Sequence, residues 1–140
     1  MSGPAHNQIC DTVEYAAQTI GCLPAQITKT MSFMLDEGPI VVGMTGDVKV
    51  SNPKFKAYFH QKAKMIQWEE VQDIIGHEPG GVCPFAVNDN VKVYLDISLK
   101  KFDYVYTAAG QNNATLGVSI EELERLSNCI EWIDICQEKQ

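Results

Sequence analysis

The segment KTMSFMLDEGPIVVGM, residues 29–44, places two apolar runs on either side of a short polar stretch. Residues 29–35 and 39–44 have the composition of strands, and Asp36-Glu37-Gly38-Pro39 is rich in turn formers. We therefore predict a β-hairpin over this segment. A cation opens the first strand, which makes Lys29 the first candidate for a functional residue.

Patterns elsewhere predict helices mixed with further strands. Ser51-Asn52-Pro53 has a polar cap followed by proline, which is typical of a helix start. Ser119 and Glu122 have the spacing of a capping box. We predict helices near 9–20, 54–62, 69–75 and from 119 onward, and strands near 64–68, 91–97, 103–109, 115–118 and 132–135. This irregular alternation favours an α/β fold of the α+β type, with a mixed sheet flanked by helices.

The length and composition fit one domain over residues 1–140. A chain of this size forms a core without disulfides or metals, and no apolar run reaches the roughly 20 residues of a membrane span. The N-terminus lacks the features of a signal peptide. The cysteines form no C-x-x-C pair, and the three scattered histidines therefore have no cysteine pair near them. We expect reduced thiols, no metal or cofactor, no membrane partner and a cytoplasmic location.

The charge distribution is uneven. A net charge of −7 argues against broad binding of DNA or RNA, because phosphate binding requires a cationic surface. Five of the eleven basic residues nevertheless lie within residues 49–64. The sequence leaves two interpretations open, a local basic patch and the solvated face of a helix.

The segment GHEPGGVCPF, residues 76–85, is a second candidate for function. Two glycines followed by a proline can present successive backbone N–H groups to a carbonyl or an oxyanion. The alternative is a plain tight turn. Cys83 and His77 would form a thiol nucleophile and its base only if they met in space, and a buried, inert cysteine is the more frequent case.

Two further loops have small or polar residues suited to ligand contact. Residues 108–113 pass from small side chains to amides, which would let a ligand approach the backbone. Asp47, in the segment 46–49, would contact an amine or satisfy a turn. Both loops also have the composition of ordinary turns.

The segments KT (29–30), GDVK (46–49), KFK (54–56), GHEPGGVCPF (76–85), VYLDISLKKF (93–102) and AAG (108–110) follow one another along the chain. In this order they resemble the YbaK/prolyl-tRNA-synthetase-associated editing-domain family, over roughly residues 10–135. The resemblance implies a mixed sheet or distorted barrel with flanking helices. It also implies a hydrolase that deacylates mischarged tRNA in trans, with water as the nucleophile.

The same resemblance assigns roles to residues. Lys29 matches the essential lysine of the family, and the backbone of Gly80, Gly81, Val82, Cys83 and Pro84 matches the loop that holds the aminoacyl carbonyl. We expect eight residues to bind substrate: Thr30, Phe33, Met44, Gly46, Asp47, Tyr94, Ala109 and Gly110. The expected partner is the 3′ end of mischarged tRNA, and an aminoacyl-tRNA synthetase is a further candidate.

Two other functions stay open. The first is a module that binds tRNA, a synthetase or an aminoacyl-nucleotide without hydrolysis. The acidic net charge favours it, as does the segment 114–117, where some relatives carry an acidic residue that is absent here. The second is a thiol hydrolase that uses Cys83 and His77.

Overall fold

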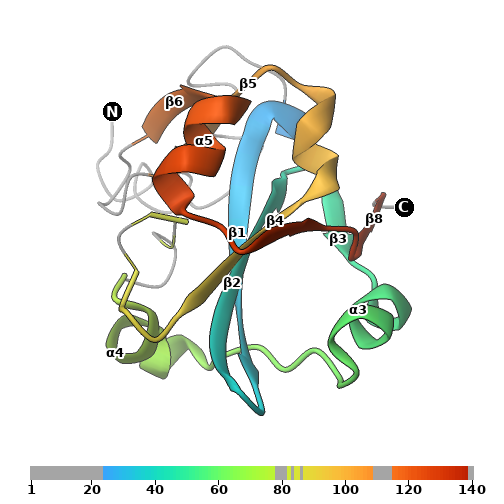
Figure 1. Cartoon of the computed structure of the whole chain (residues 1–140), viewed down its shortest axis with the longest axis vertical. Helices are drawn as coiled ribbons and strands as arrows, with labels where there is room; N and C mark the ends of the chain where they lie inside the picture. Colours follow the sequence, from blue (N-terminus) through green and yellow to red (C-terminus); the bar gives the residue numbers. More distant parts are fainter. Residues whose placement is uncertain (1–23, 78–81, 83, 86, 109–114, 139–140) are drawn as a thin grey trace, which may run out of the picture.

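The computed structural model describes residues 24–77, 82, 84–85, 87–108 and 115–138 of the chain. The helix predicted near 9–20 lies outside these residues. A six-stranded sheet forms the centre of the fold, in the order β6-β5-β1-β2-β4-β7, and a separate pair joins β3 to β8. Figure 1 shows the long hairpin of β1 and β2 at the middle, with α3 on one side and α4 and α5 on the other.

The elements have the following bounds. The strands are β1 (Ile27–Leu35), β2 (Gly38–Thr45), β3 (Val48–Val50), β4 (Lys92–Asp96), β5 (Tyr104–Ala108), β6 (Thr115–Ser119), β7 (Glu131–Ile133) and β8 (Cys136–Glu138). The α-helices are α3 (Asn52–Phe59), α4 (Val71–Ile75) and α5 (Ile120–Ser127). The 3-10 helices are η1 (Pro24–Gln26), η2 (Trp68–Glu70) and η3 (Ile97–Lys101).

The predicted hairpin is confirmed. β1 and β2 pair antiparallel, with Leu35 opposite Gly38 at the turn and Lys29 opposite Met44 near the other end. Gly38 has a φ of 133°, a conformation that glycine adopts without steric cost. The mixed sheet is also confirmed, because β1 pairs parallel with β5 and β2 pairs parallel with β4.

The predicted helix caps are confirmed as well. The Ser51 hydroxyl accepts from the backbone N–H of Lys54 at the start of α3, and Ser119 and Glu122 form the capping box of α5. The first of these helices ends at Phe59 and not near residue 62, because His60 adopts a left-handed conformation with a φ of 62°. α4 ends at Gly76, as predicted, but η2 replaces its predicted first turn.

The strand predicted near 64–68 is wrong. Only one isolated bridge forms there, between Met65 and Phe33. Two backbone hydrogen bonds flank it, Met34 N–H to the Lys64 carbonyl and Ile66 N–H to the Ser32 carbonyl. The pairing stops there because the chain then turns into η2.

Alternation along the strands gives the sheet two buried faces. The face toward α3 carries a cluster that includes Phe33, Val42, Met44 and Phe55. The other face carries two clusters, one centred on Val41 beside α4 and one on Leu95 beside α5. Among the described residues, no helix is both long enough and apolar enough to cross a membrane.

Candidate functional site

Lys29 occupies a half-buried position on β1, close to the β3–β8 pair. Its ammonium donates a hydrogen bond of 2.5 Å to the backbone carbonyl of Val48. Val48 is itself held opposite Glu138 by the β3–β8 pairing. A carbonyl is neutral, so this contact orients the lysine without cancelling its charge. A lysine at this strand end was foreseen from the sequence, whereas its partner carbonyl on a three-residue strand was not.

Phe33 and Met44, two of the predicted substrate-binding residues, lie in the packed core beneath α3. The ring centroid of Phe33 is 5.0 Å from that of Phe55, and Met44 Sδ lies 3.5 Å from Cys136 Sγ. Cys136 and Cys129 are free cysteines. Burial, helped by the nearby Asp96 carboxylate, raises the pKa of Cys136, and the charge of Lys29 opposes this effect. Lys29 therefore lies at the edge of this core.

Thr30 and Thr28 place two hydroxyls on the opposite face of β1. Both Oγ1 atoms are buried and have no hydrogen-bond partner among the residues that the structure describes. A buried polar group without a partner costs about 1–3 kcal/mol, so a ligand that bonded these hydroxyls would recover that free energy. Gly43 lies directly opposite Thr30 on β2 and adds no side chain there. The sequence pointed to Thr30, whereas the alternation of Thr28, Thr30 and Ser32 would have identified Thr28 as well.

Asp47 and Gly46 form the turn between β2 and β3. The Asp47 carboxylate accepts from the Thr45 hydroxyl at 2.6 Å and pairs with the Lys101 ammonium at 3.0 Å. Partial burial alone would raise the pKa of Asp47, but these two partners outweigh it and hold the pKa below its ordinary value. Of the two roles foreseen for Asp47, the structure displays the turn, together with an ion pair.

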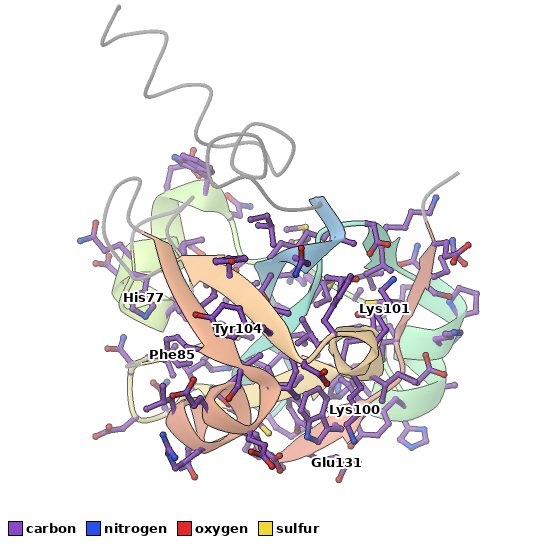
Figure 2. All side chains as sticks on the ribbon, turned by 90° about the horizontal axis from the view of Figure 1, so that it is seen from above. His77, Phe85, Lys100, Lys101, Tyr104 and Glu131 are labelled. Atoms are coloured by element: carbon purple, nitrogen blue, oxygen red, sulfur yellow. The ribbon has the colours of Figure 1, made fainter. Side chains whose placement is uncertain are left out.

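The predicted carbonyl-binding loop begins at the end of α4. Gly76, with a φ of 102°, terminates the helix, and a His77 ring nitrogen lies 2.7 Å from the Phe85 carbonyl oxygen. This contact joins the two ends of the segment 76–85, and His77 and Phe85 lie close together in Figure 2. Gly80, Gly81 and Cys83 lie outside the described residues, as do Ala109 and Gly110.

The described residues of this loop pack on the face of the sheet away from α3. Pro84 is buried, Val82 packs against the cluster centred on Val41, and Phe85 packs against the cluster centred on Leu95. Lys29 instead reaches toward Val48 on the other face. The convergence of the Lys29 ammonium with the backbone N–H groups of the 80–84 loop, which residues 80–83 carry, stays a prediction.

Tyr94 lies on β4 opposite Val42 and faces α3. Its ring packs edge-on against Phe59, with centroids 5.2 Å apart. Burial raises the pKa of Tyr94, and the charges of Glu131 and Glu37 raise it further. Tyr94 lines a pocket toward the hairpin turn, so the structure does not group it with Lys29. No cluster of metal-binding side chains occurs in the part of the chain that the structure describes.

Comparison with known proteins now identifies the family. The model of the aminoacyl-tRNA editing domain matches residues 8–126. The chain belongs to this family. This match confirms the resemblance noted from the motifs. Domains of this family act in aminoacyl-tRNA editing, which maintains the fidelity of translation.

Relatives and solved structures agree with the family and with the fold. The chain is 42% identical over 129 residues to the uncharacterized protein YwhH of Bacillus subtilis, covering 91% of this chain and 82% of that protein. It is 26% identical to a proline–tRNA ligase of Bacillus licheniformis, covering 93% of this chain but only 23% of the ligase. A solved structure described as a candidate trans-editing enzyme for prolyl-tRNA synthetase is 25% identical, with a TM-score of 0.83 over 94% of this chain and 82% of that chain.

Proposed function

We propose that this editing domain hydrolyses the ester bond between a wrongly attached amino acid and tRNA, acting in trans. Water attacks the carbonyl carbon, the bond to the ribose oxygen breaks, and the products are a free amino acid and tRNA with its hydroxyl restored. The match to the editing-domain model over residues 8–126 carries this proposal. The likeness to the candidate trans-editing structure supports it.

Lys29 serves this reaction as a fixed positive charge. Its ammonium is oriented by the Val48 carbonyl and sits at the edge of an apolar core, where electrostatic interactions are stronger than in water. It binds the terminal phosphate or the ester region of the substrate. An aminoacyl ester is already activated, so positioning it and stabilising its oxyanion suffice without a nucleophilic side chain.

The backbone N–H groups of residues 80–83, in the loop that ends at Pro84, supply the donors for the oxyanion. Preorganised N–H groups of this kind contribute about 10²–10³ in rate. The hydrogen bond between His77 and Phe85 supports the role by fixing the two ends of the segment. Thr30, with its buried hydroxyl, is the best-placed of the remaining candidates to bond the substrate.

A panel of mischarged tRNAs incubated with the purified full chain tests this function. We expect release of amino acid from at least one small aminoacyl-tRNA, and unchanged release by the Cys83→Ala variant. Loss of activity in Cys83→Ala would instead indicate a thiol hydrolase. Tight binding without release on the whole panel would indicate a non-catalytic module, the alternative that the net charge of −7 favours.

A further inference from the structure

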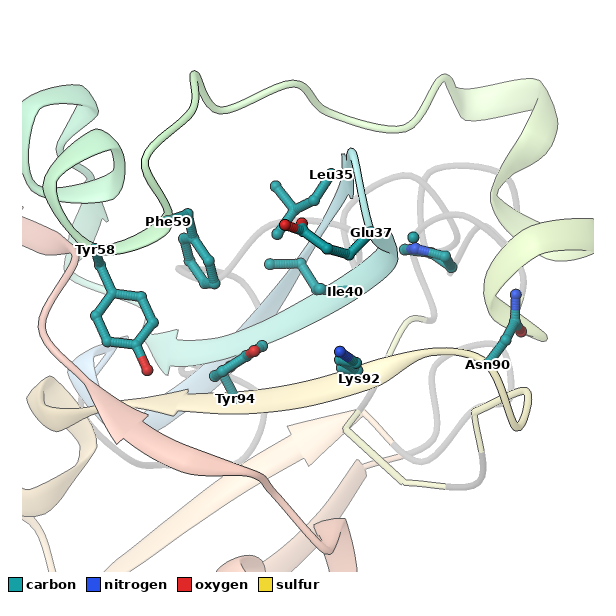
Figure 3. Close-up of a pocket in the computed structure, with 10 residues that line it drawn as sticks. Leu35, Glu37, Ile40, Tyr58, Phe59, Asn90, Lys92 and Tyr94 are labelled. Atoms are coloured by element: carbon teal, nitrogen blue, oxygen red, sulfur yellow. The ribbon is translucent and has the colours of Figure 1, made fainter.

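A pocket of about 480 Å³ opens at the hairpin end of β1 and β2, where it is bounded by β4 and the end of α3. Figure 3 shows Leu35 and Ile40 along one wall, the rings of Tyr58, Phe59 and Tyr94 at one end, and Lys92 beside them. From Lys29 to Leu35, β1 advances six residues, or about 20 Å at roughly 3.3 Å per residue. The pocket is therefore separate from the site proposed for the ester.

The aromatic end of the pocket is held in place by its own contacts. Tyr58 and Tyr94 each meet Phe59 edge-on, with centroids 4.8 Å and 5.2 Å away. The Tyr58 hydroxyl donates to the Glu131 carboxylate, and burial together with this bond keeps the pKa of Tyr58 far above its ordinary value. Rings fixed in this way would lose little conformational entropy when a ligand packs against them.

The polar groups of the pocket suit a base that carries an exocyclic amine. Glu37 supplies a carboxylate, which accepts hydrogen bonds from such amines, and the Asn90 amide can accept or donate. The Glu37 charge also helps to raise the pKa of the Tyr94 hydroxyl, in line with the place of both residues in this pocket. The Gln61 amide donates to Glu37 at 3.2 Å and ties the hairpin turn to the segment after α3.

Exposed lysines lie at the pocket and on the connection beside it. Lys92 lines the pocket and is exposed. Lys62 and Lys64 are also exposed, on the connection after α3 that runs past the pocket in Figure 3. That connection is anchored by the bond from Met34 N–H to the Lys64 carbonyl. Cations beside an aromatic surface are the combination that binds single-stranded nucleic acid.

We propose that this pocket binds one unpaired base of a tRNA, with the base against the aromatic rings and the adjacent phosphate on Lys92. This inference rests on the proposed function, since a trans-editing protein must hold tRNA at points beyond the ester. Cytosine, adenine and guanine fit better than uracil, because each of them carries an exocyclic amine that could donate to Glu37. Single-stranded RNA is commonly recognised by bases stacked on aromatic side chains in this manner.

Binding of uncharged RNA by the full chain tests the inference. The probes are a fluorescent RNA hairpin with a short single-stranded 3′ extension and the same hairpin cut flush. We expect Tyr94→Leu and Lys92→Ala to weaken binding of the extended hairpin by about tenfold or more, with little effect on the flush one. Lys92→Ala should also reduce the slope of log affinity against log salt concentration by the amount expected for about one phosphate contact. Tyr104→Leu and Lys49→Ala, which change exposed residues away from the pocket, are the matched controls.

Two outcomes would overturn the inference. The first is binding of the extended hairpin by both pocket variants within twofold of the wild type. The second is that Tyr94→Leu loses binding of an arginine peptide but binds the RNA as the wild type does. That result would assign the pocket to a protein partner. If Tyr94→Leu fails to fold, the isosteric change Glu37→Gln on the surface replaces it as a pocket variant. Because these RNAs carry no ester, the result is independent of whether the protein hydrolyses aminoacyl-tRNA.

Discussion

Hydroxyls on neighbouring strands differ sharply in how they are bonded. Thr28 Oγ1 is buried and has no hydrogen-bond partner in the described part of the chain, whereas Thr45, which is also buried, donates to Asp47 at 2.6 Å. Replacing an unpartnered hydroxyl by a methyl group removes a penalty, but replacing a bonded one breaks an interaction. We expect Thr28→Val to leave the free energy of unfolding unchanged or raise it by up to about 1 kcal/mol, and Thr45→Val to lower it by about 1 kcal/mol.

Urea unfolding of the two variants measures this contrast. A clear destabilisation by Thr28→Val, equal to that of Thr45→Val, would show that Thr28 is bonded in solution. The pair is matched in residue type and burial, so the comparison isolates the hydrogen bond.

Asp47 gives the fold a defined dependence on acid. Its folded-state pKa lies below the ordinary value of 3.8, so the carboxylate stabilises the fold above pH 3.8, and this contribution is lost as the pH falls through the folded-state pKa. Because the pair with Lys101 is largely exposed, we expect Asp47→Asn to cost only about 0.2–1 kcal/mol at neutral pH. Unfolding measured over a pH series should show this difference shrinking below pH 3.8. A difference that stays constant, or that resembles the exposed control Asp89→Asn, would contradict the assignment.

At the scale of elements, Asn88 links α4 to the end of the predicted carbonyl-binding loop. Its side chain donates to the carbonyls of Asp73 and Ile74 at 3.2 Å and 3.0 Å, and so caps the last turn of the helix. We expect Asn88→Ala to lower the free energy of unfolding by about 1 kcal/mol and to slow deacylation, because the loop would lose its anchor. The control is Gln72→Ala, on the exposed side of α4. Equal effects of the two substitutions would remove Asn88 from this role.

Elements whose signals are local were predictable from the sequence. The hairpin of β1 and β2 and the caps at Ser51 and Ser119 depend on neighbours a few residues away. β3 and β8 were not predicted, and they form only where two distant segments of the chain pair. The equally short β7, at Glu131–Ile133, overlaps the strand predicted near 132–135. A strand was predicted near 64–68, but only one bridge forms there, at Met65. Hydrophobic periodicity does not reveal how far a neighbouring strand can pair with a segment.

The same division applies to the candidate site. Lys29 and Thr30 stood out as residue types at a strand start, but the Val48 carbonyl that orients Lys29 comes from tertiary pairing. The pocket beside Tyr94 combines residues of the hairpin, α3 and β4, which no single motif joins. The roles of residues 80–84 came from family resemblance, and they stay predictions.

At the scale of the whole molecule, the structure shows where the lysines of the basic segment 49–64 lie. Lys54 pairs with Asp134 on the solvated face of α3, which accounts for part of the lysine-rich segment. Lys62 and Lys64 stay exposed near the pocket, in a chain whose net charge is −7. Such a distribution favours a few defined phosphate contacts over general attraction to nucleic acid.

The most direct measurement is the single-turnover rate of deacylation of a mischarged tRNA by the wild type, Lys29→Ala and Lys49→Ala. Lys49 is an exposed lysine on the neighbouring strand β3 and serves as the matched control. We predict that Lys29→Ala slows the reaction by about 10²-fold or more, the loss typical of one preorganised electrostatic group, while Lys49→Ala changes it little. A Lys29→Ala variant that folds normally and deacylates at the wild-type rate would contradict the account.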